Sequence, residues 1–195
     1  LDIAGIQKHE NMAGNSIFSK KPEYGKDFVY GSSDRVDEAY EMSRTIRTDK
    51  YRYVRNFLPY LPLLQPNFYT DQSEIMTELK KFQGDKDLSP AQKTLFMPKR
   101  AAEELYDLEK DHFEVNNLVG DPALKDILAG HRILLAAEMK ESYDTGLMPE
   151  PEMMRLAIGS TPFEIAKNAE IYPIDEILKA CDLILESSTA KSDII

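Results

Sequence analysis

The sequence predicts an α+β fold, with a small antiparallel sheet packed by one long helix and followed by a short helical extension. Two β-prone runs, residues 43–48 and 51–57, flank the polar pair Asp49-Lys50, as in a hairpin. A third short β-prone run, residues 104–108, can supply another strand. Residues 121–143 repeat apolar side chains at helical spacing and predict the long helix that covers the sheet.

Composition limits the kinds of partner. The chain has 195 residues, 42% of them hydrophobic, and a net charge of −10. No basic cluster stands apart from acidic residues, which argues against nucleic acid and against an anionic membrane as partners. No apolar run is long enough to cross a bilayer. Cys181 is the single cysteine, so an internal disulfide, a cysteine-rich zinc site and a CxxC redox pair are excluded.

The hairpin carries arginines and tyrosines at alternating positions. Arg44 and Ile46 fall on one face of the first arm, and Tyr53 and Arg55 fall on one face of the second. This pattern suits a half-covered sheet with anchored guanidinium groups. The alternative is an edge hairpin whose arginines are solvated. In the third strand we expect Tyr106 and Leu108 to point together toward the long helix.

Capping residues predict the shorter helices. Asp71 can cap a helix over residues 72–82, and Ser89 with Pro90 begins a second, short one. Thr161 opens a third, and Pro173 opens a fourth. The stripe of the fourth helix contains the single cysteine, which packing explains better than reactivity. Its members are Ile174, Ile177, Leu178, Cys181, Ile184 and Leu185.

Two places could hold a metal or a catalytic base. Acidic residues surround the turn after the third strand, beside His112, and a calcium or zinc site there is conceivable. The EF-hand glycine and terminal glutamate are missing, so a solvated turn, in which Asp side chains accept backbone amides, is the simpler interpretation. The acidic residues are Asp107, Glu109, Asp111 and Glu114. His131 lies on the apolar stripe of the long helix and is expected to be semi-buried rather than catalytic.

With these segments in place, the order of motifs resembles the C-terminal part of the sulfatase family. LDIAGI stands at the start, SRTIRTDKYRYVRNF follows, then AEELYDLEKDHFEVNNL, and then the long helix. The first motif is carried by Arg44, Arg47, Thr48, Asp49, Tyr51, Arg52 and Tyr53. The second is carried by Glu104, Leu105, Tyr106, Asp107, Leu108, Asp111, Glu114, Asn117 and Leu118. The match covers about residues 1–143, and His112 replaces a proline usual in the family.

The resemblance implies a formylglycine-dependent enzyme of the alkaline-phosphatase-like superfamily. Its nearest kinds are arylsulfatases and heparan N-sulfatases of bacterial type, with a helical C-terminal extension. It divides this chain into residues 1–145, the C-terminal part of the sulfatase-like domain, and residues 146–195, the extension. The beginning at LDIAGI reads like a helix running into a glycine stop, so we expect a fragment of a longer protein.

Catalysis is expected to depend on sequence outside this chain. The family uses a Cys- or Ser-x-Pro-x-Arg motif, whose first residue becomes formylglycine, and a calcium ion, both placed upstream. Here Cys181 is followed by Asp182-Leu183, so we assign no catalytic residue, no metal ligand and no cofactor to this chain. Calcium and formylglycine are expected in the parent enzyme, which would be periplasmic or secreted. Its substrate would be a sulfated saccharide or another sulfate ester.

The chain would complete the catalytic domain, with the rest of the parent as its partner, and line one wall of the substrate cleft. The candidate substrate-binding residues are Asp34, Arg35, Asp37 and Glu38, in an expected charged loop between two strands. A solvated loop is the alternative. Two other functions stay open at this point: a non-catalytic module whose late helices bind a protein, and a fragment of a related phosphate- or phosphonate-ester hydrolase.

Overall fold

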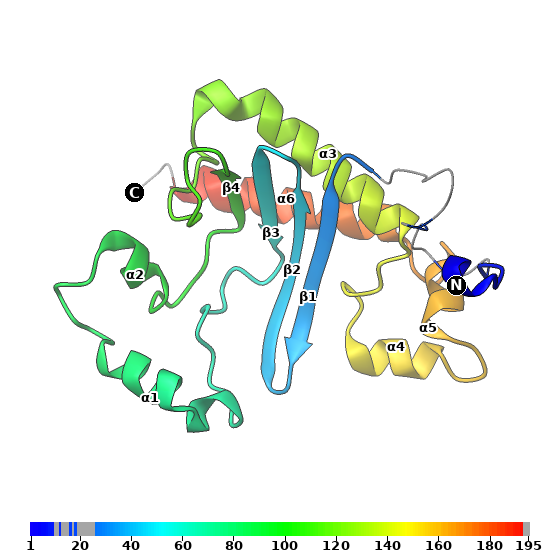
Figure 1. The fold of residues 1–195 in the computed structure, drawn as a ribbon, viewed down its shortest axis with the longest axis horizontal. Helices are drawn as coiled ribbons and strands as arrows, with labels where there is room; N and C mark the ends of the chain where they lie inside the picture. The colour runs from blue at the N-terminus through cyan, green and yellow to red at the C-terminus, as the bar shows by residue number, and fades with distance from the viewer. Residues whose placement is uncertain (10–11, 13–15, 17, 19–25, 193–195) are drawn as a thin grey trace.

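The computed structural model confirms the α+β fold and describes residues 1–9, 12, 16, 18 and 26–192. Four strands form one antiparallel sheet in the order β1-β2-β3-β4 (Figure 1). The strands are β1 (Val29–Val36), β2 (Ala39–Arg47), β3 (Tyr51–Asn56) and β4 (Glu103–Asp107). The expected hairpin is confirmed as β2 and β3, and the Thr48 amide closes its turn by donating to the Tyr51 carbonyl at 2.9 Å.

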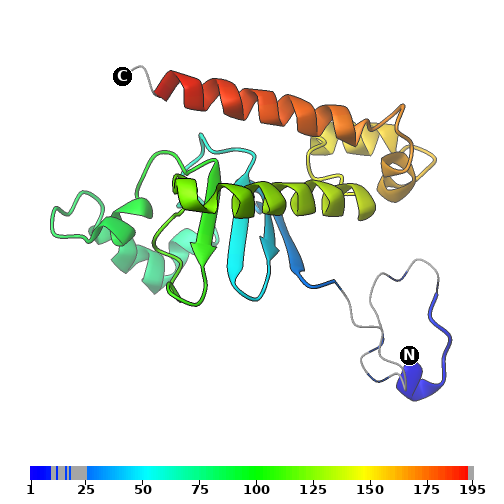
Figure 2. The ribbon, with the colours of Figure 1, turned by 90° about the horizontal axis from the view of Figure 1, so that it is seen from above.

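Helices supply the second layer and the surface segments. The longest are α3 (Lys125–Glu141) and α6 (Ile174–Ser192), which lie on the same side of the sheet (Figure 2). Among the described residues, no helix combines the length and the apolar character needed to span a membrane. The others are η1 (Asp2–Ala4), η2 (Thr70–Gln72), α1 (Glu74–Lys81), α2 (Pro90–Thr94), η3 (Pro122–Leu124), α4 (Glu150–Leu156) and α5 (Pro162–Ala166).

The helix boundaries confirm some caps and correct others. Ser89 caps α2 in a full capping box with Pro90 in the first turn, and Thr161 caps α5, both as expected. The cap of α1 is Ser73, whose hydroxyl accepts from the Met76 amide. Asp71, the expected cap, instead forms an ion pair with Lys80 at 2.8 Å, because the chain first makes the short turn η2.

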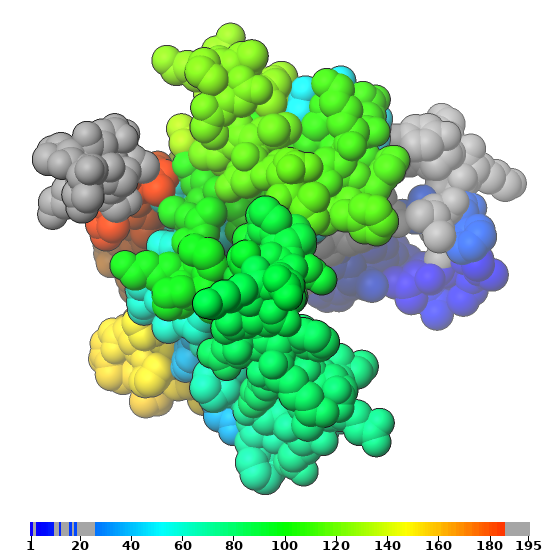
Figure 3. Space-filling view, turned by 90° about the vertical axis from the view of Figure 1, so that its left-hand side faces the viewer, coloured from blue at the N-terminus to red at the C-terminus, as the bar shows by residue number. Residues whose placement is uncertain are grey.

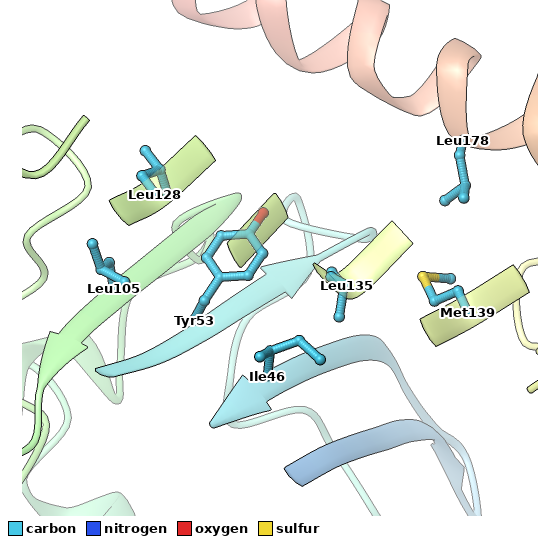
Figure 4. Close-up of a cluster of buried hydrophobic side chains, with 7 residues drawn as sticks. All are labelled: Ile46, Tyr53, Leu105, Leu128, Leu135, Met139 and Leu178. Carbon is cyan, nitrogen blue, oxygen red and sulfur yellow. The ribbon is translucent and has the colours of Figure 1, made fainter. Parts of the chain in front are cut away.

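The core lies between the helices and one face of the sheet. Cross-strand pairing places Ile46, Tyr53 and Leu105 in one row across β2, β3 and β4. All three are 1% exposed or less. Leu128, Leu135 and Met139 of α3 pack onto this row, and Leu178 of α6 joins the same cluster (Figure 4). Leu178 lies after the domain boundary predicted at residue 145 and still belongs to this core. That boundary therefore stays a prediction.

The expected orientation of β4 is wrong by one residue. Leu105 is the buried apolar side chain, Tyr106 lies on the opposite face, and Leu108 follows the strand. The buried face also holds Glu103 and Asp107. The pattern of apolar residues did not indicate that these two charged residues are buried. Glu103 is tolerated there because Tyr53 Oη donates to it at 2.6 Å and Arg132 Nε at 2.7 Å.

The buried row makes a direct stability prediction. Leu105→Ala should lower the free energy of unfolding by about 2–5 kcal/mol, since it leaves a cavity under α3. Ile133→Ala is the matched control, because Ile133 lies on α3 with 70% of its surface exposed and should change stability by less than about 0.5 kcal/mol. Chemical denaturation measures both, and equal effects of the two changes would contradict this packing.

Candidate functional site at the tip of the first hairpin

The charged run expected to form a loop is mostly strand. β1 continues through Asp34 and Arg35 to Val36, and only Asp37 and Glu38 form the turn into β2. The reason is pairing with β2, which runs from Val29↔Arg47 to Val36↔Ala39 and accommodates an irregularity between Ser33 and Arg35. Asp37 takes a φ of 51°, a conformation that Asp and Asn adopt more readily than most residues. The four candidates therefore lie at one hairpin tip.

Arg35 is held from two sides. Its Nε lies 3.0 Å from Glu150 Oε1 at the start of α4, and its guanidinium carbon lies 5.7 Å from the ring centre of Tyr40. Its side chain is still 44% exposed. Asp37 and Glu38 are exposed beside it. The arrangement leaves a fixed guanidinium and two carboxylates available to a ligand at the surface.

The segment between β3 and β4 is attached to the same tip. Gln65 pairs with the backbone of Tyr40: its Nε2 donates to the Tyr40 carbonyl at 2.5 Å, and its Oε1 accepts from the Tyr40 amide at 3.3 Å. Asn67, only 5% exposed, donates to the Val36 carbonyl at 3.1 Å and accepts from the amides of Tyr69 and Thr70. These bonds fix the path of the segment, so the tip has a structured neighbour on this side.

Asp34 is exposed at the surface, but one of its carboxylate oxygens pairs with a buried arginine. Arg44 is fully buried, and its Nη1 lies 2.8 Å from Asp34 Oδ1. Its Nε and Nη2 donate to the two oxygens of Asp144 at 2.5 and 2.8 Å, and Tyr30 Oη also donates to that carboxylate. A bidentate pair of this kind is the strong form of the Arg–carboxylate interaction. Asp34 is thus part of the frame beneath the tip.

Glycine at position 146 is required by this frame. A Cβ there would lie 1.7 Å from Arg44 Nη2, so any side chain would displace the guanidinium. The Gly146 amide also donates to Asp144 Oδ1 at 2.8 Å. The helix α3 ends at Glu141, just before the end expected at residue 143, and Tyr143 takes a φ of 55°. That early turn brings Asp144 back to Arg44.

The protonation of the frame follows from these contacts. Burial alone would raise the pKa of Asp144, but hydrogen bonds from Arg44 and Tyr30 outweigh it and hold that pKa below its usual value. Burial would lower the pKa of Arg44, yet Asp144 and Asp34 raise it above its ordinary value. Arg44 and Asp144 therefore remain an ion pair at neutral pH.

Glu103 forms a second buried charge cluster on the same face. Burial would raise its pKa, but Arg132 and Tyr53 bond to the carboxylate and the net shift is downward. Arg55, 6% exposed, reaches Glu103 at 3.4 Å and the Cys181 carbonyl at 3.1 Å. For Arg44 and Arg55 the anchored interpretation of the hairpin is therefore confirmed and the solvated one is wrong.

The acidic turn after β4 binds its own backbone. Asp107 Oδ1 accepts from the amides of Glu109 and Lys110, and Asp111 Oδ2 accepts from those of Val115 and Asn116. The expected bonding of Asp side chains to backbone amides is confirmed, although Asp107 itself is buried rather than solvated. Within the described part of the chain, no three His, Cys, Asp or Glu side chains gather as a metal site. The residues present do not fit a calcium ion.

His131 and Cys181 occupy packed positions. The Nδ1 of His131, 7% exposed, lies 2.8 Å from the Ile127 carbonyl, and its ring meets that of Tyr51 edge-on at 6.1 Å. Cys181 is half-buried on α6, and burial raises the pKa of its thiol. A raised pKa keeps the thiol protonated and poorly nucleophilic. Both residues match the packing roles expected of them.

Sequence reasoning missed several residues that build the tip. Asp144 and Glu150 lie a hundred or more positions after the arginines with which they pair, so no local pattern could indicate the pairing. Gln65 and Asn67 lay in a proline- and leucine-rich linker. The one available signal was Asn67, because Asn side chains often organise turns.

No protein-family model matches this chain. Two curated proteins of Formosa agariphila, both named ulvan-active sulfatase, do match. The first is 26% identical over 154 residues, which cover 79% of this chain and 26% of the relative. The second is 29% identical over 133 residues, which cover 65% of this chain and 24% of the relative. The chain thus spans about a quarter of the length of the curated relatives that it matches.

Two solved structures are also similar. One is a crystal structure from Bacteroides thetaiotaomicron described as that of a sulfatase, with 24% identity and a TM-score of 0.46. The other is described as a 2-O GAG sulfatase, with 24% identity and a TM-score of 0.47. Each alignment covers 73% of this chain and 23% of the other. The resemblance to sulfatases that the sequence motifs predict is confirmed by the matches to the curated relatives.

The buried frame predicts a specific acid sensitivity. Asp144→Asn should lower the free energy of unfolding by about 3 kcal/mol, since Arg44 loses its bidentate partner in the interior. Because the pKa of Asp144 is lowered on folding, its contribution is complete above the unfolded value of about 4 and is lost as pH falls through the folded value. Denaturation at several pH values should give the variant a shallower loss of stability in acid. The control is Glu78→Gln, which removes an exposed pair with Lys81; an unchanged slope for Asp144→Asn would contradict the assignment.

Proposed function

We propose that this chain, similar in sequence to sulfatases, is the C-terminal portion of a sulfuric ester hydrolase. It would complete the catalytic domain and line one wall of the substrate cleft. Support comes from the two ordered motifs, from the matches to curated sulfatases and from the short share of those relatives that the chain covers. The fold, with a rigid sheet carrying a charged hairpin tip, suits a binding role within a larger enzyme.

The reaction itself would be carried out by residues outside this chain. Formylglycine would supply the nucleophile and calcium would stabilise negative charge on the sulfate, and both would belong to the preceding part of the parent. The half-buried Cys181 has neither the sequence context nor a lowered thiol pKa for that role. This chain's contribution would be to bind and orient the ester.

The observation that carries the cleft-wall role is the state of Arg35. It is fixed by Glu150 and Tyr40 yet remains 44% exposed, at a tip braced by Arg44 below and Asn67 beside it. A held guanidinium can bind a sulfate or a carboxylate through two parallel hydrogen bonds, whereas a lysine cannot. Asp37 and Glu38 could accept hydrogen bonds from sugar hydroxyls. The substrate class we propose is therefore a sulfated saccharide.

Activity of the longer protein tests the proposal. The protein encoded by the full reading frame should hydrolyse 4-nitrophenyl sulfate or a sulfated polysaccharide, and the 195-residue chain alone should release no product above a buffer blank. The control is the full protein with alanine at the first position of its Cys- or Ser-x-Pro-x-Arg motif. Turnover by the isolated chain, or a full protein lacking that motif, would refute the proposal.

Arg35→Lys in the full protein tests the cleft wall. We expect kcat/KM for a sulfated saccharide to fall by an amount equivalent to about 1–3 kcal/mol, while kcat/KM for a small aryl sulfate stays nearly constant. Arg155→Lys is the control, because Arg155 is exposed on α4 and, among the described residues, bonds to Glu152 of the same helix. An equal loss on both substrates would assign Arg35 to general folding instead.

A further inference from the structure

The two faces of the sheet are covered unequally. One face lies under α3 and α6 and contains the buried row of Ile46, Tyr53 and Leu105. Figure 1 looks onto the other face, with α6 running behind the strands. Cross-strand pairing places Thr45, Val54 and Glu104 in one row on this uncovered face, and Arg52 with Tyr106 in the next. In the described chain these residues keep part of their surface open to solvent.

The uncovered face is the floor of a groove of about 850 Å³. One wall is the end of α2 with residues 97–101, and the other is residues 113–117 after β4. Figure 3 shows the side of the molecule on which the segments of both walls lie, in green and yellow-green. The groove is therefore a built feature, bounded by ordered chain on both sides.

The polar groups of the groove are already arranged. Arg52 donates to Glu114 at 2.6 Å, and Tyr106 donates to Glu104 at 2.7 Å. Arg100 donates through both Nη atoms to Glu41, to the carboxylate at 3.0 Å and to the carbonyl at 3.1 Å. Its side chain is only 8% exposed, and its Nε has no hydrogen-bond partner within the described chain. This arginine has unused donor capacity beside the groove.

The charges of the groove balance. Four cations and three anions line it, but one of the cations, Arg44, is buried and paired with Asp144 and Asp34. The other charged lining residues are the cations Arg52, Lys99 and Arg100 and the anions Glu41, Glu104 and Glu114. A site for a polyanion or a free phosphate would show an excess of positive charge. Once the internally paired Arg44 is set aside, both signs are equal in number, and their mixture with hydroxyl and amide groups suits a polypeptide surface instead.

Large apolar residues surround this polar floor. Phe113 is 89% exposed, Val115 50%, Met97 49% and Leu63 44%, and all four line the groove. Exposed apolar side chains gathered around a cavity mark an interaction surface. Their combination with hydrogen-bonding groups is typical of contacts between domains of one chain, which are more polar than a core.

We infer that the uncovered face of the sheet is the docking surface for the catalytic part of the same polypeptide. This inference rests on the function proposed above, and it names the partner. The curated relatives are about four times as long as their aligned portions, so most of a protein of that kind would remain to be packed against this chain. The docked part would cover Phe113 and bring hydrogen-bond acceptors to the groove.

Surface labelling of the unmodified full protein tests this directly. With hydroxyl-radical footprinting, normalised to the unfolded protein, Phe113 should be labelled at least about fivefold less than Ile133 if the face is covered. Ile133 is the matched site, since it is 70% exposed on α3, on the other side of the sheet. Comparable labelling of the two residues would overturn the inference.

A pair of variants in the full protein gives the energetic test. Phe113→Asp should speed proteolytic release of this portion about tenfold relative to wild type, the ratio equivalent to about 1.4 kcal/mol. Ile133→Asp should leave the rate unchanged. Equal rates of release for the two variants would overturn the docking surface. A change from dimer to monomer on Phe113→Asp, measured by light scattering, would also overturn it, because a second copy of the protein would then be the occupant.

The two proposals fail in different ways. If the full protein hydrolyses sulfate esters but Phe113 is labelled freely, the proposed function stands and the docking surface is wrong. If Phe113 is protected and Phe113→Asp speeds release, yet no sulfate ester is hydrolysed, the docking surface stands and the proposed activity is wrong.

Discussion

The buried guanidinium of Arg44 is the constraint on which the arrangement of this chain depends. A fully buried charge is unfavourable unless neighbouring groups neutralise it and satisfy its hydrogen bonds. Asp34 does so from the adjacent strand, and Asp144 does so from a position a hundred residues later. The pairing of Asp144 with Arg44 fixes the path of the chain after α3. It explains the early end of that helix, the left-handed Tyr143 and the absence of a side chain at Gly146.

The same interaction connects stability to the candidate site. Asp34 precedes Arg35 in β1, so the strand that carries the exposed guanidinium is held by the buried one. After Gly146 the chain enters α4, whose Glu150 pairs with Arg35, while Gln65 and Asn67 fasten the other flank to the hairpin. The Arg35 side chain would therefore lose little conformational entropy when a ligand binds at the tip, and such preorganisation favours selective binding.

The sheet divides two tasks between its faces. One face holds the apolar core together with two paired charge clusters, around Asp144 and Glu103, and is closed by α3 and α6. The other presents hydroxyls, amides and balanced charges under a rim of exposed apolar residues. This unequal covering is what a portion of a larger enzyme would need: enough core to define its shape, and an unfinished surface through which it joins the rest.

The sequence by itself determined the hairpin of β2 and β3, the presence of β4, the long helix α3 and the caps at Ser89 and Thr161. These features depend on residues only a few positions apart, whose spacing and turn chemistry act locally. It also carried the two motifs that resemble sulfatases. The tertiary structure alone decided that β1 extends through Asp34 and Arg35, that Leu105 rather than Tyr106 faces the core, and that Arg44 is buried. Each of these depends on partners distant in the chain, Asp144 and Arg132 among them, because whether a charge is buried or solvated is set by what meets it in space.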